Sequence, residues 1–204
     1  MTVIHDEQNV IWAQDRSDAV AAAIRQVVPS GLSGMDYGCG PGHIGLRLAD
    51  HFSSLDLVDT SADIVAALRA LIADRPSLDA YRLDLTSDPP PRQVDCVFAS
   101  MSFHHVPFTV HLLDGLARTV NPSGWLVVVD FHADNGELHS AEPEFDGHNG
   151  FDPTELARLM TTRGFAVTSM HDVWSGQRWA GDRLVDYTLF MIVARVSTSP
   201  VLTR

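Results

Sequence analysis

The sequence predicts an α/β protein built on a doubly wound, mostly parallel sheet. Short apolar runs alternate with amphipathic segments of helical spacing, which is the pattern of repeated strand–helix units. The first run leads into a glycine-rich turn at residues 38–42, and an amphipathic segment begins directly after it. The most hydrophobic run, residues 125–129, suits a central strand buried on both faces.

The composition is that of one globular domain. The chain has 204 residues, 45% hydrophobic and 20% charged, without repeats, linkers or low-complexity tracts, so a single domain is expected over residues 1–204. No apolar run approaches the ~20 residues that cross a bilayer, and no secretory signal is visible. The two cysteines have no metal-binding spacing. We therefore expect a cytoplasmic protein without a membrane partner.

The charge of the chain limits its partners. A formal net charge of −12 argues against a nucleic-acid partner, because phosphate contacts need clustered lysine and arginine. A small-molecule partner remains compatible with this charge. The sequence leaves the oligomeric state open.

Residues 1–30 precede the first strand and are expected to be helical. Ser17 is the expected N-cap of a helix with apolar positions 20, 21, 24, 27 and 28, and residues 29–31 stop it. We expect this helix to pack on the sheet. A lid over a pocket is the alternative for the segment around Trp12.

The remaining elements follow in chain order. Further strands are expected at residues 54–59, 80–83, 94–99 and 125–129. Helices are expected at about 42–51, from 61 to before 76, and around 112–120, and residues 121–124 are expected to form a turn. Residues 131–150 are polar and suit a loop over the carboxyl edge of the sheet.

The last part of the chain predicts a helix and two strands. Asp152, Pro153 and Glu155 have the residue types of a well-formed helix start. Strands are expected at 165–173 and 184–196, joined by a polar loop that contains Trp174 and Trp179.

The glycine turn is the first candidate binding element. Glycines allow positive φ angles and let a ligand approach the backbone, and the helix start beyond offers free N–H groups. A dinucleotide fingerprint needs a third glycine where His43 stands, and a phosphate-binding loop needs a lysine that is absent here. These differences favour a nucleoside ligand without a pyrophosphate over a nicotinamide dinucleotide.

Two acids stand at the ends of predicted strands. Asp59 follows the second strand about 20 residues after the turn, where a doubly wound sheet brings a carboxylate within reach of ribose hydroxyls. The alternative for Asp59 is a helix-start acid that interacts with the helix dipole. Asp84 follows the third strand in the same way.

Taken in this order, these segments resemble the class I S-adenosylmethionine-dependent methyltransferases of the small-molecule branch. The resemblance covers essentially the whole chain and rests on residues 36–42, 57–61, 83–85, 100–106 and 121–124. It implies a Rossmann-like seven-stranded sheet whose last strand runs antiparallel. It also implies S-adenosylmethionine as cofactor, S-adenosylhomocysteine as product, and methyl transfer to an oxygen, nitrogen or carbon atom of a small molecule.

The resemblance further implies a cofactor site. Asp59 would bind the ribose hydroxyls, Asp84 and the backbone of Leu85 the adenine edge, and backbone groups of the glycine turn and Ser100 the methionine tail. The full expected set is Tyr37, Gly38, Cys39, Gly40, Asp59, Thr60, Asp84, Leu85, Ser100 and Met101.

Histidines are the candidate catalytic residues. Methyl transfer is an in-line displacement that depends mainly on alignment, and a general base is needed only when the acceptor must lose a proton. His105 and His148 are the candidate bases because imidazole titrates near neutral pH, with loop packing as the alternative for each. His104 is expected to face away from the pocket or toward solvent.

Three rival interpretations remain. One is a catalytically silent S-adenosylmethionine-binding protein with a regulatory role, and another is a nicotinamide oxidoreductase of similar topology. The third is a metal site formed by Asp130, His132 and His139, but these residues lack a metal-ligand spacing and no metal is expected.

Overall fold

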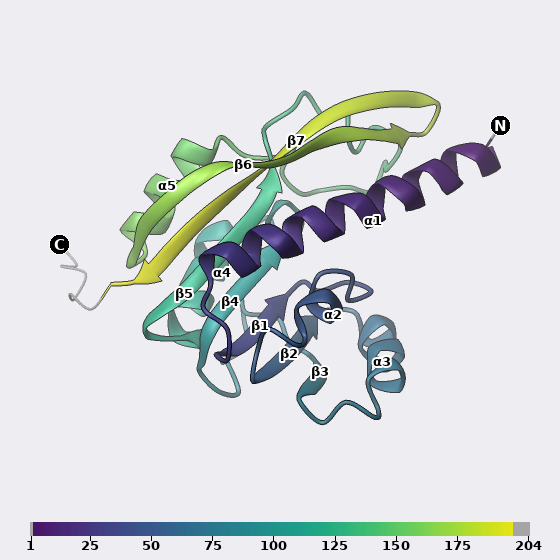
Figure 1. Ribbon diagram of the computed structural model, residues 1–204. Helices are drawn as coiled ribbons and strands as arrows, with labels where there is room; N and C mark the ends of the chain where they lie inside the picture. Colours follow the sequence, from purple (N-terminus) through teal and green to yellow (C-terminus); the bar gives the residue numbers. More distant parts are fainter. Residues whose placement is uncertain (1, 198–204) are drawn as a thin grey trace.

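The computed structural model describes residues 2–197, with side chains from residue 8 onward, and confirms the predicted sheet. Seven strands lie in the order β3-β2-β1-β4-β5-β7-β6, and β1 to β5 are parallel, whereas β7 is antiparallel to both of its neighbours (Figure 1). The strands are β1 (Ser33–Tyr37), β2 (Ser54–Asp59), β3 (Leu78–Arg82), β4 (Val94–Ser100), β5 (Val120–Phe131), β6 (Phe165–Ala180) and β7 (Arg183–Val196).

Helices cover both faces of this sheet and separate its core into two layers. They are α1 (Thr2–Val27), α2 (Gly45–Leu48), α3 (Ala62–Leu71), the short 3₁₀ helix η1 (Phe103–His105), α4 (Thr109–Thr119) and α5 (Pro153–Thr162). Helices α1, α2 and α3 lie on one face of the sheet, and α4 and α5 lie on the other (Figure 1). Their buried apolar side chains form two separate core clusters, one on each face. Among the described helices, none is both long and apolar enough to cross a membrane.

Helix α1 begins much earlier than the expected N-cap. It is one helix of 26 residues, and Ser17 lies in its interior, where the hydroxyl donates to the carbonyl of Ala13 at 2.6 Å. The expectation of a cap at Ser17 is therefore wrong. The first half of α1 is held by β6, because the side-chain amide of Asn9 donates to the carbonyl of Trp179 (3.2 Å) and accepts from its backbone N–H (2.9 Å).

The β6–β7 hairpin is longer than expected, with strands of 16 and 14 residues. Trp174 and Trp179 lie within β6, so their expected place in a loop is wrong. Two register shifts in β6 interrupt the in-and-out alternation that marks a strand in sequence. The indole N–H of Trp174 donates to Asp15 of α1 at 3.1 Å, which ties this hairpin to the first helix.

Other boundaries differ in smaller ways. The expected helix at 42–51 is reduced to α2, with turns on either side. Residues 121–124 form the irregular beginning of β5 and not a separate turn; there Ser123 has a φ of 60° and Asn121 donates to the Asp95 carboxylate at 2.8 Å. The predicted start of α5 is confirmed, since the carboxylate of Asp152 accepts from the N–H groups of Thr154 and Glu155.

Residues 133–150 form the long loop that the sequence predicts, without a helix or strand of their own. The loop returns to η1, where the N–H of His148 donates to the carbonyl of His104 at 2.7 Å. Its path beside η1 places polar side chains near the carboxyl ends of β1, β4 and β5.

Candidate functional site

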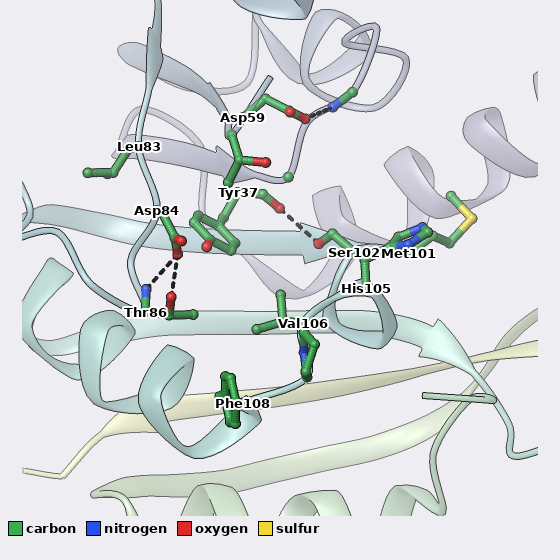
Figure 2. A pocket seen from close by; sticks show the side chains of 14 residues that line it. Tyr37, Asp59, Leu83, Asp84, Thr86, Met101, Ser102, His105, Val106 and Phe108 are labelled. Atoms are coloured by element: carbon green, nitrogen blue, oxygen red, sulfur yellow. Dashed lines mark hydrogen bonds between the residues drawn. The ribbon is translucent and has the colours of Figure 1, made fainter. Parts of the chain in front are cut away.

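The carboxyl ends of β1 to β4 surround a cavity of about 670 Å³. Most of the predicted cofactor residues line it, and Figure 2 shows Asp84 on one side of the Tyr37 ring and Ser102 and Met101 on the other. The predicted residues in this wall are Tyr37, Gly38, Gly40, Asp59, Thr60, Asp84 and Met101. Parallel strands bring their carboxyl ends to one edge, which explains why segments far apart in sequence meet here.

The glycine turn presents bare backbone to this cavity. Gly38 has a φ of 70°, and a Cβ atom there would lie only 2.4 Å from the Cβ of Ser102. The Ser102 hydroxyl donates to the carbonyl of Tyr37 at 3.0 Å and so holds the end of β1 against the segment after β4 (Figure 2). At Gly40, with a φ of 50°, a Cβ atom would meet nothing within 4 Å, so this face of the turn is open to a ligand.

Asp59 joins the end of β2 to the glycine turn. One carboxylate oxygen accepts from the N–H of Gly40 and the other from the N–H of Ser61, both at 2.9 Å. Each oxygen keeps a further lone pair that can accept a hydrogen bond from a ligand. The side chain also lines the cavity, so it can brace the turn and bind a hydroxyl at the same time.

The wall beyond β3 is formed by Leu83, Asp84 and Thr86. One carboxylate oxygen of Asp84 accepts from the N–H and the hydroxyl of Thr86, at 2.9 and 2.7 Å (Figure 2). Leu85 is fully buried, and its N–H donates to the Tyr37 hydroxyl at 3.3 Å. Thr86 lines the cavity and sequence reasoning missed it, whereas the predicted Leu85 is not among the lining residues; only its position two residues after the strand-end acid pointed to Thr86.

Cys39 and Ser100 line a smaller pocket of about 270 Å³ on the other side of the glycine turn. The two spaces share walls formed by Gly38, Gly40, Met101 and His105. Burial raises the pKa of the Cys39 thiol, so this side chain is a neutral wall group at physiological pH.

Arg16 of α1 also lines the smaller pocket, and sequence reasoning missed it. One guanidinium nitrogen donates to the Tyr187 hydroxyl at 2.7 Å, while Nε is buried without a partner in the described structure. Ser100 Oγ and His139 Nε2 are buried without a partner around the same pocket. Because unsatisfied buried polar atoms are rare and costly, three around one pocket indicate a polar ligand.

The candidate histidines lie in different places. His105 is only partly covered and contributes to the walls of both pockets. The partial burial of its ring, together with the neighbouring His104 and His139, lowers its pKa. His148 lies in a third cavity, between α4 and α5, where Nε2 is 3.2 Å from the Thr109 hydroxyl and 3.1 Å from the Val106 carbonyl. These contacts attach the 133–150 loop to the segment after η1.

His104 is not directed to solvent, so that expectation is wrong. Its side chain is 2% exposed, and Nδ1 lies 2.7 Å from a carboxylate oxygen of Asp130, which is itself fully buried. The other oxygen of Asp130 accepts from the backbone N–H of His104 at 3.1 Å. Asp130 stands at the end of β5, where the sheet carries it directly against η1.

The side chains of the weighed metal site have separate partners. His132 Nε2 is 2.6 Å from Asp172, His139 Nδ1 is 3.2 Å from Glu142, and Asp130 binds His104. Within residues 2–197, no group of three or more histidine, cysteine or acidic side chains is arranged to hold a metal ion.

Asp36 is a buried carboxyl directly beneath the glycine turn. It is 2% exposed, and one of its oxygens has no hydrogen-bond partner in the described structure. Burial raises its pKa to about 7, opposed by a hydrogen bond from the backbone of Gly45 and reinforced by the charge of Asp59. The absence of a side chain at Gly45 permits this contact, because a Cβ atom there would lie 2.7 Å from the Asp36 carboxyl.

Because the pKa of Asp36 is raised in the folded state, we expect the unfolding free energy of the protein to depend on pH. Between the ordinary pKa of about 4 and about 7, the folded protein holds a proton on Asp36 that the unfolded chain has lost, so stability falls as the pH rises through this window. Asp36→Asn removes the titration. The difference in unfolding free energy, Asp36→Asn minus unmodified protein, should increase by roughly 3 kcal/mol between pH 4.5 and pH 7.5, because only the unmodified protein loses stability over this range.

Urea denaturation of both proteins at three pH values measures this difference. Asp74→Asn, at an exposed position, is the matched control and should show no such trend. A constant difference between the Asp36→Asn and unmodified proteins over this range would contradict a raised pKa at Asp36.

Comparison with known proteins identifies the family that carries this site. A family model described as "Methyltransferase domain" matches residues 12–170. The chain belongs to this methyltransferase family. S-adenosylmethionine is the cofactor of these enzymes, and the open glycine turn with its strand-end carboxylates fits such a nucleoside.

Similar proteins agree with this assignment. An uncharacterised methyltransferase of Schizosaccharomyces pombe is 29% identical over 150 residues, which cover 64% of this chain and 52% of the relative. A trans-aconitate 2-methyltransferase of Mycobacterium tuberculosis is 32% identical over 96 residues, 46% of this chain and 35% of the relative. The chain thus spans about half the length of the first relative and about a third of the second.

A solved structure shows the same fold over nearly the whole chain. The crystal structure of a putative methyltransferase from Bacillus halodurans superposes with a TM-score of 0.74. The match covers 87% of this methyltransferase and 99% of the other chain at 15% sequence identity, so it supports the architecture alone.

Proposed function

We propose that this methyltransferase transfers the methyl group of S-adenosylmethionine to an oxygen, nitrogen or carbon atom of a small molecule. The observation that carries the proposal is the junction of two pockets at the glycine turn. The larger pocket has the carboxylates and open backbone that suit an adenosine. The smaller pocket has buried polar atoms that lack a hydrogen-bond partner, which a bound ligand could supply.

The adenosine is proposed to lie in the larger cavity. Asp59 accepts hydrogen bonds from the ribose hydroxyls while it holds the turn through the Gly40 N–H. Asp84 and Thr86 face the adenine edge, and the Tyr37 ring lies between the two acids (Figure 2). Backbone groups of the glycine turn direct the methionine tail toward the smaller pocket.

Arg16 is proposed to bind the carboxylate of the methionine tail. Its only hydrogen bond to the described part of the chain goes to the Tyr187 hydroxyl, which leaves its charge without a carboxylate partner there. A ligand carboxylate would supply that partner and satisfy the buried Nε atom. Ser100 lines the same pocket, and a rotation of its buried, unpartnered hydroxyl would let it donate to the same tail.

The bound cofactor supplies an electrophilic methyl group on a sulfonium centre. The chain aligns the acceptor with that group and excludes water, which accounts for much of the catalysis in such a displacement. We propose that the acceptor enters the smaller pocket beside the methionine tail, with the part of α1 around Arg16 as its cover, because Arg16 and Ser17 line it. The volume of this pocket, about 270 Å³, suits a small acceptor. A relative is named for a small molecule, trans-aconitate, and the net charge of −12 also argues against a nucleic acid.

Calorimetric titration with S-adenosylmethionine and S-adenosylhomocysteine tests this proposal, together with formation of S-adenosylhomocysteine in the presence of acceptors. Micromolar binding with turnover supports the function. Binding without turnover of any acceptor would support the rival, a silent cofactor-binding protein. The absence of binding to both ligands would overturn the cofactor assignment.

Arg16→Ala should weaken S-adenosylhomocysteine binding by about 10- to 100-fold, the effect of losing a charge-assisted contact of 1.5–3 kcal/mol. Binding of 5′-methylthioadenosine, which lacks the carboxylate, should not change. Arg75→Ala, at an exposed position, is the control and should bind both ligands normally. An equal loss for both ligands in the Arg16 variant would show that Arg16 does not bind the tail.

A further inference from the structure

His104 and Asp130 form a buried pair at the wall of the smaller pocket. Asp130 is fully enclosed and accepts three hydrogen bonds, from the Nδ1 atom and backbone N–H of His104 and from the backbone N–H of Phe131. Each oxygen of Asp130 also accepts a backbone N–H, so the geometry favours a carboxylate that accepts from Nδ1 of His104. In this tautomer the free lone pair of the ring lies on Nε2.

The other nitrogen of the His104 ring, Nε2, lies on the side of the ring away from Asp130, and His104 lines the smaller pocket. The part of the chain that the structure describes makes no hydrogen bond to Nε2. His139 and Phe131 flank the ring, with centroids 5.2 and 4.8 Å from its own, and limit its rotation. A fixed imidazole with a free lone pair at a ligand pocket has the form of a general base.

We propose that His104, oriented by Asp130, is the general base of this methyltransferase and that its acceptor is a hydroxyl compound. The proposal rests on the proposed function and specifies its acceptor. A carboxylate acceptor is already ionised at neutral pH and requires no base, whereas a hydroxyl must lose its proton during or before attack. The buried dyad therefore favours the hydroxyl class.

The step balances without a further reactant. The acceptor O–H bond breaks and its proton moves to Nε2 of His104, while an oxygen electron pair forms the bond to the methyl carbon. The carbon–sulfur bond breaks and its electron pair stays on sulfur. The imidazolium that results lies beside the Asp130 carboxylate, which stabilises it in this enclosed site.

Other charged groups around the pocket can influence this base. They come from each element that packs against it: His43 of the turn before α2, His105 of η1, Asp130 of β5, Arg16 of α1, Arg178 of β6, and His139 and Glu142 of the loop. Glu142 contacts both His139 and Arg178, so its charge is shared within the wall. Asp130 alone among them holds a ring nitrogen of His104.

His104→Asn tests the base directly. The asparagine amide can still donate to Asp130 from the position of Nδ1, but it has no group in the place of Nε2. We expect S-adenosylhomocysteine affinity within about threefold of the unmodified protein and a loss of at least about 100-fold in kcat for hydroxyl acceptors. His171→Asn, on the exposed face of β6, is the matched control and should retain full turnover.

The acceptor probes are catechol and 1-propanol for the hydroxyl class, and benzoate and trans-aconitate for the carboxylate class. Methylation of a hydroxyl probe that depends on His104 supports the proposal. Methylation of carboxylates alone, or of none of the hydroxyl probes, overturns the acceptor class.

Nitrogen-15 NMR of histidine-labelled protein gives a readout that does not depend on turnover. His104 should have a protonated Nδ1 and an unprotonated Nε2 at pH 8. Asp130→Asn should raise the population with a proton on Nε2 and lower kcat while the KM for S-adenosylmethionine stays unchanged, as expected of a positioning residue. A proton on Nε2 in the unmodified protein, or full turnover by His104→Asn, would defeat this inference while cofactor binding still upheld the proposed function.

Discussion

Asp59→Asn is expected to weaken S-adenosylhomocysteine binding by about 100-fold. The substitution removes one of two acceptor oxygens and places an NH₂ group against a backbone N–H of Gly40 or Ser61, both of which now donate to Asp59. The loss of charged hydrogen bonds to the ribose is worth about 1.5–3 kcal/mol, and distortion of the glycine turn adds to it. Calorimetry measures the change in Kd.

A ligand without one ribose hydroxyl separates these two causes. If Asp59 binds the ribose, 2′- or 3′-deoxy S-adenosylhomocysteine should bind the Asp59→Asn variant almost as well as the complete ligand does, because the shared interaction is already lost. Asp63→Asn removes the same charge from an exposed position at the start of α3 and should bind normally. If the Asp59→Asn variant binds S-adenosylhomocysteine within about threefold of the unmodified protein, Asp59 is excluded as the residue that binds the ribose.

Gly115→Ala is expected to lower the unfolding free energy by about 2–4 kcal/mol. In an isolated helix this substitution would stabilise by about 1 kcal/mol. In α4, however, a Cβ atom at position 115 would lie 2.1 Å from the carbonyl oxygen of Leu85 and 2.9 Å from its carbonyl carbon. Backbone cannot yield as a flexible side chain can, so the helix and the segment after β3 must separate.

The same displacement should reach the cofactor site. Asp84 and Thr86 flank Leu85 and line the larger cavity, so weaker S-adenosylhomocysteine binding should accompany the loss of stability. Urea denaturation and calorimetry measure the two effects. His111→Ala, on the exposed side of α4, loses only a ring contact with Phe108 and gains helix propensity, so it should change stability by less than about 1 kcal/mol. A Gly115→Ala protein as stable as the original would contradict the close approach of α4 to Leu85.

Local pattern was sufficient for the architecture and for much of the larger cavity. The strand runs, the glycine turn and the acids Asp59 and Asp84 each sit at a recognisable place in a strand–helix unit. In a parallel sheet, that place dictates which edge they occupy. The structure gathers Tyr37, Gly40 and Asp59 around one space for this reason.

The longer-range features could not be predicted in the same way. The first half of α1 has no apolar stripe, and its packing depends on hydrogen bonds to β6, about 170 residues later. The register shifts in β6 broke the alternation that would have placed Trp174 in a strand. Thr86 lines the larger cavity, whereas Leu85 is buried with its N–H bound to the Tyr37 hydroxyl, and neither fact follows from the local pattern.

The sequence by itself therefore determined the doubly wound fold and the strand-end acids, because these follow from periodicity and from turns a few residues long. The methyltransferase family followed from the resemblance of those segments to a known family, which the family match over residues 12–170 bears out. Only the tertiary structure decided which polar side chains meet at the smaller pocket. Arg16 reaches it from the first helix, and His104 is fixed by Asp130, 26 residues later. Such contacts depend on how the helices and the long loop pack on the sheet, and a local sequence pattern cannot predict that packing.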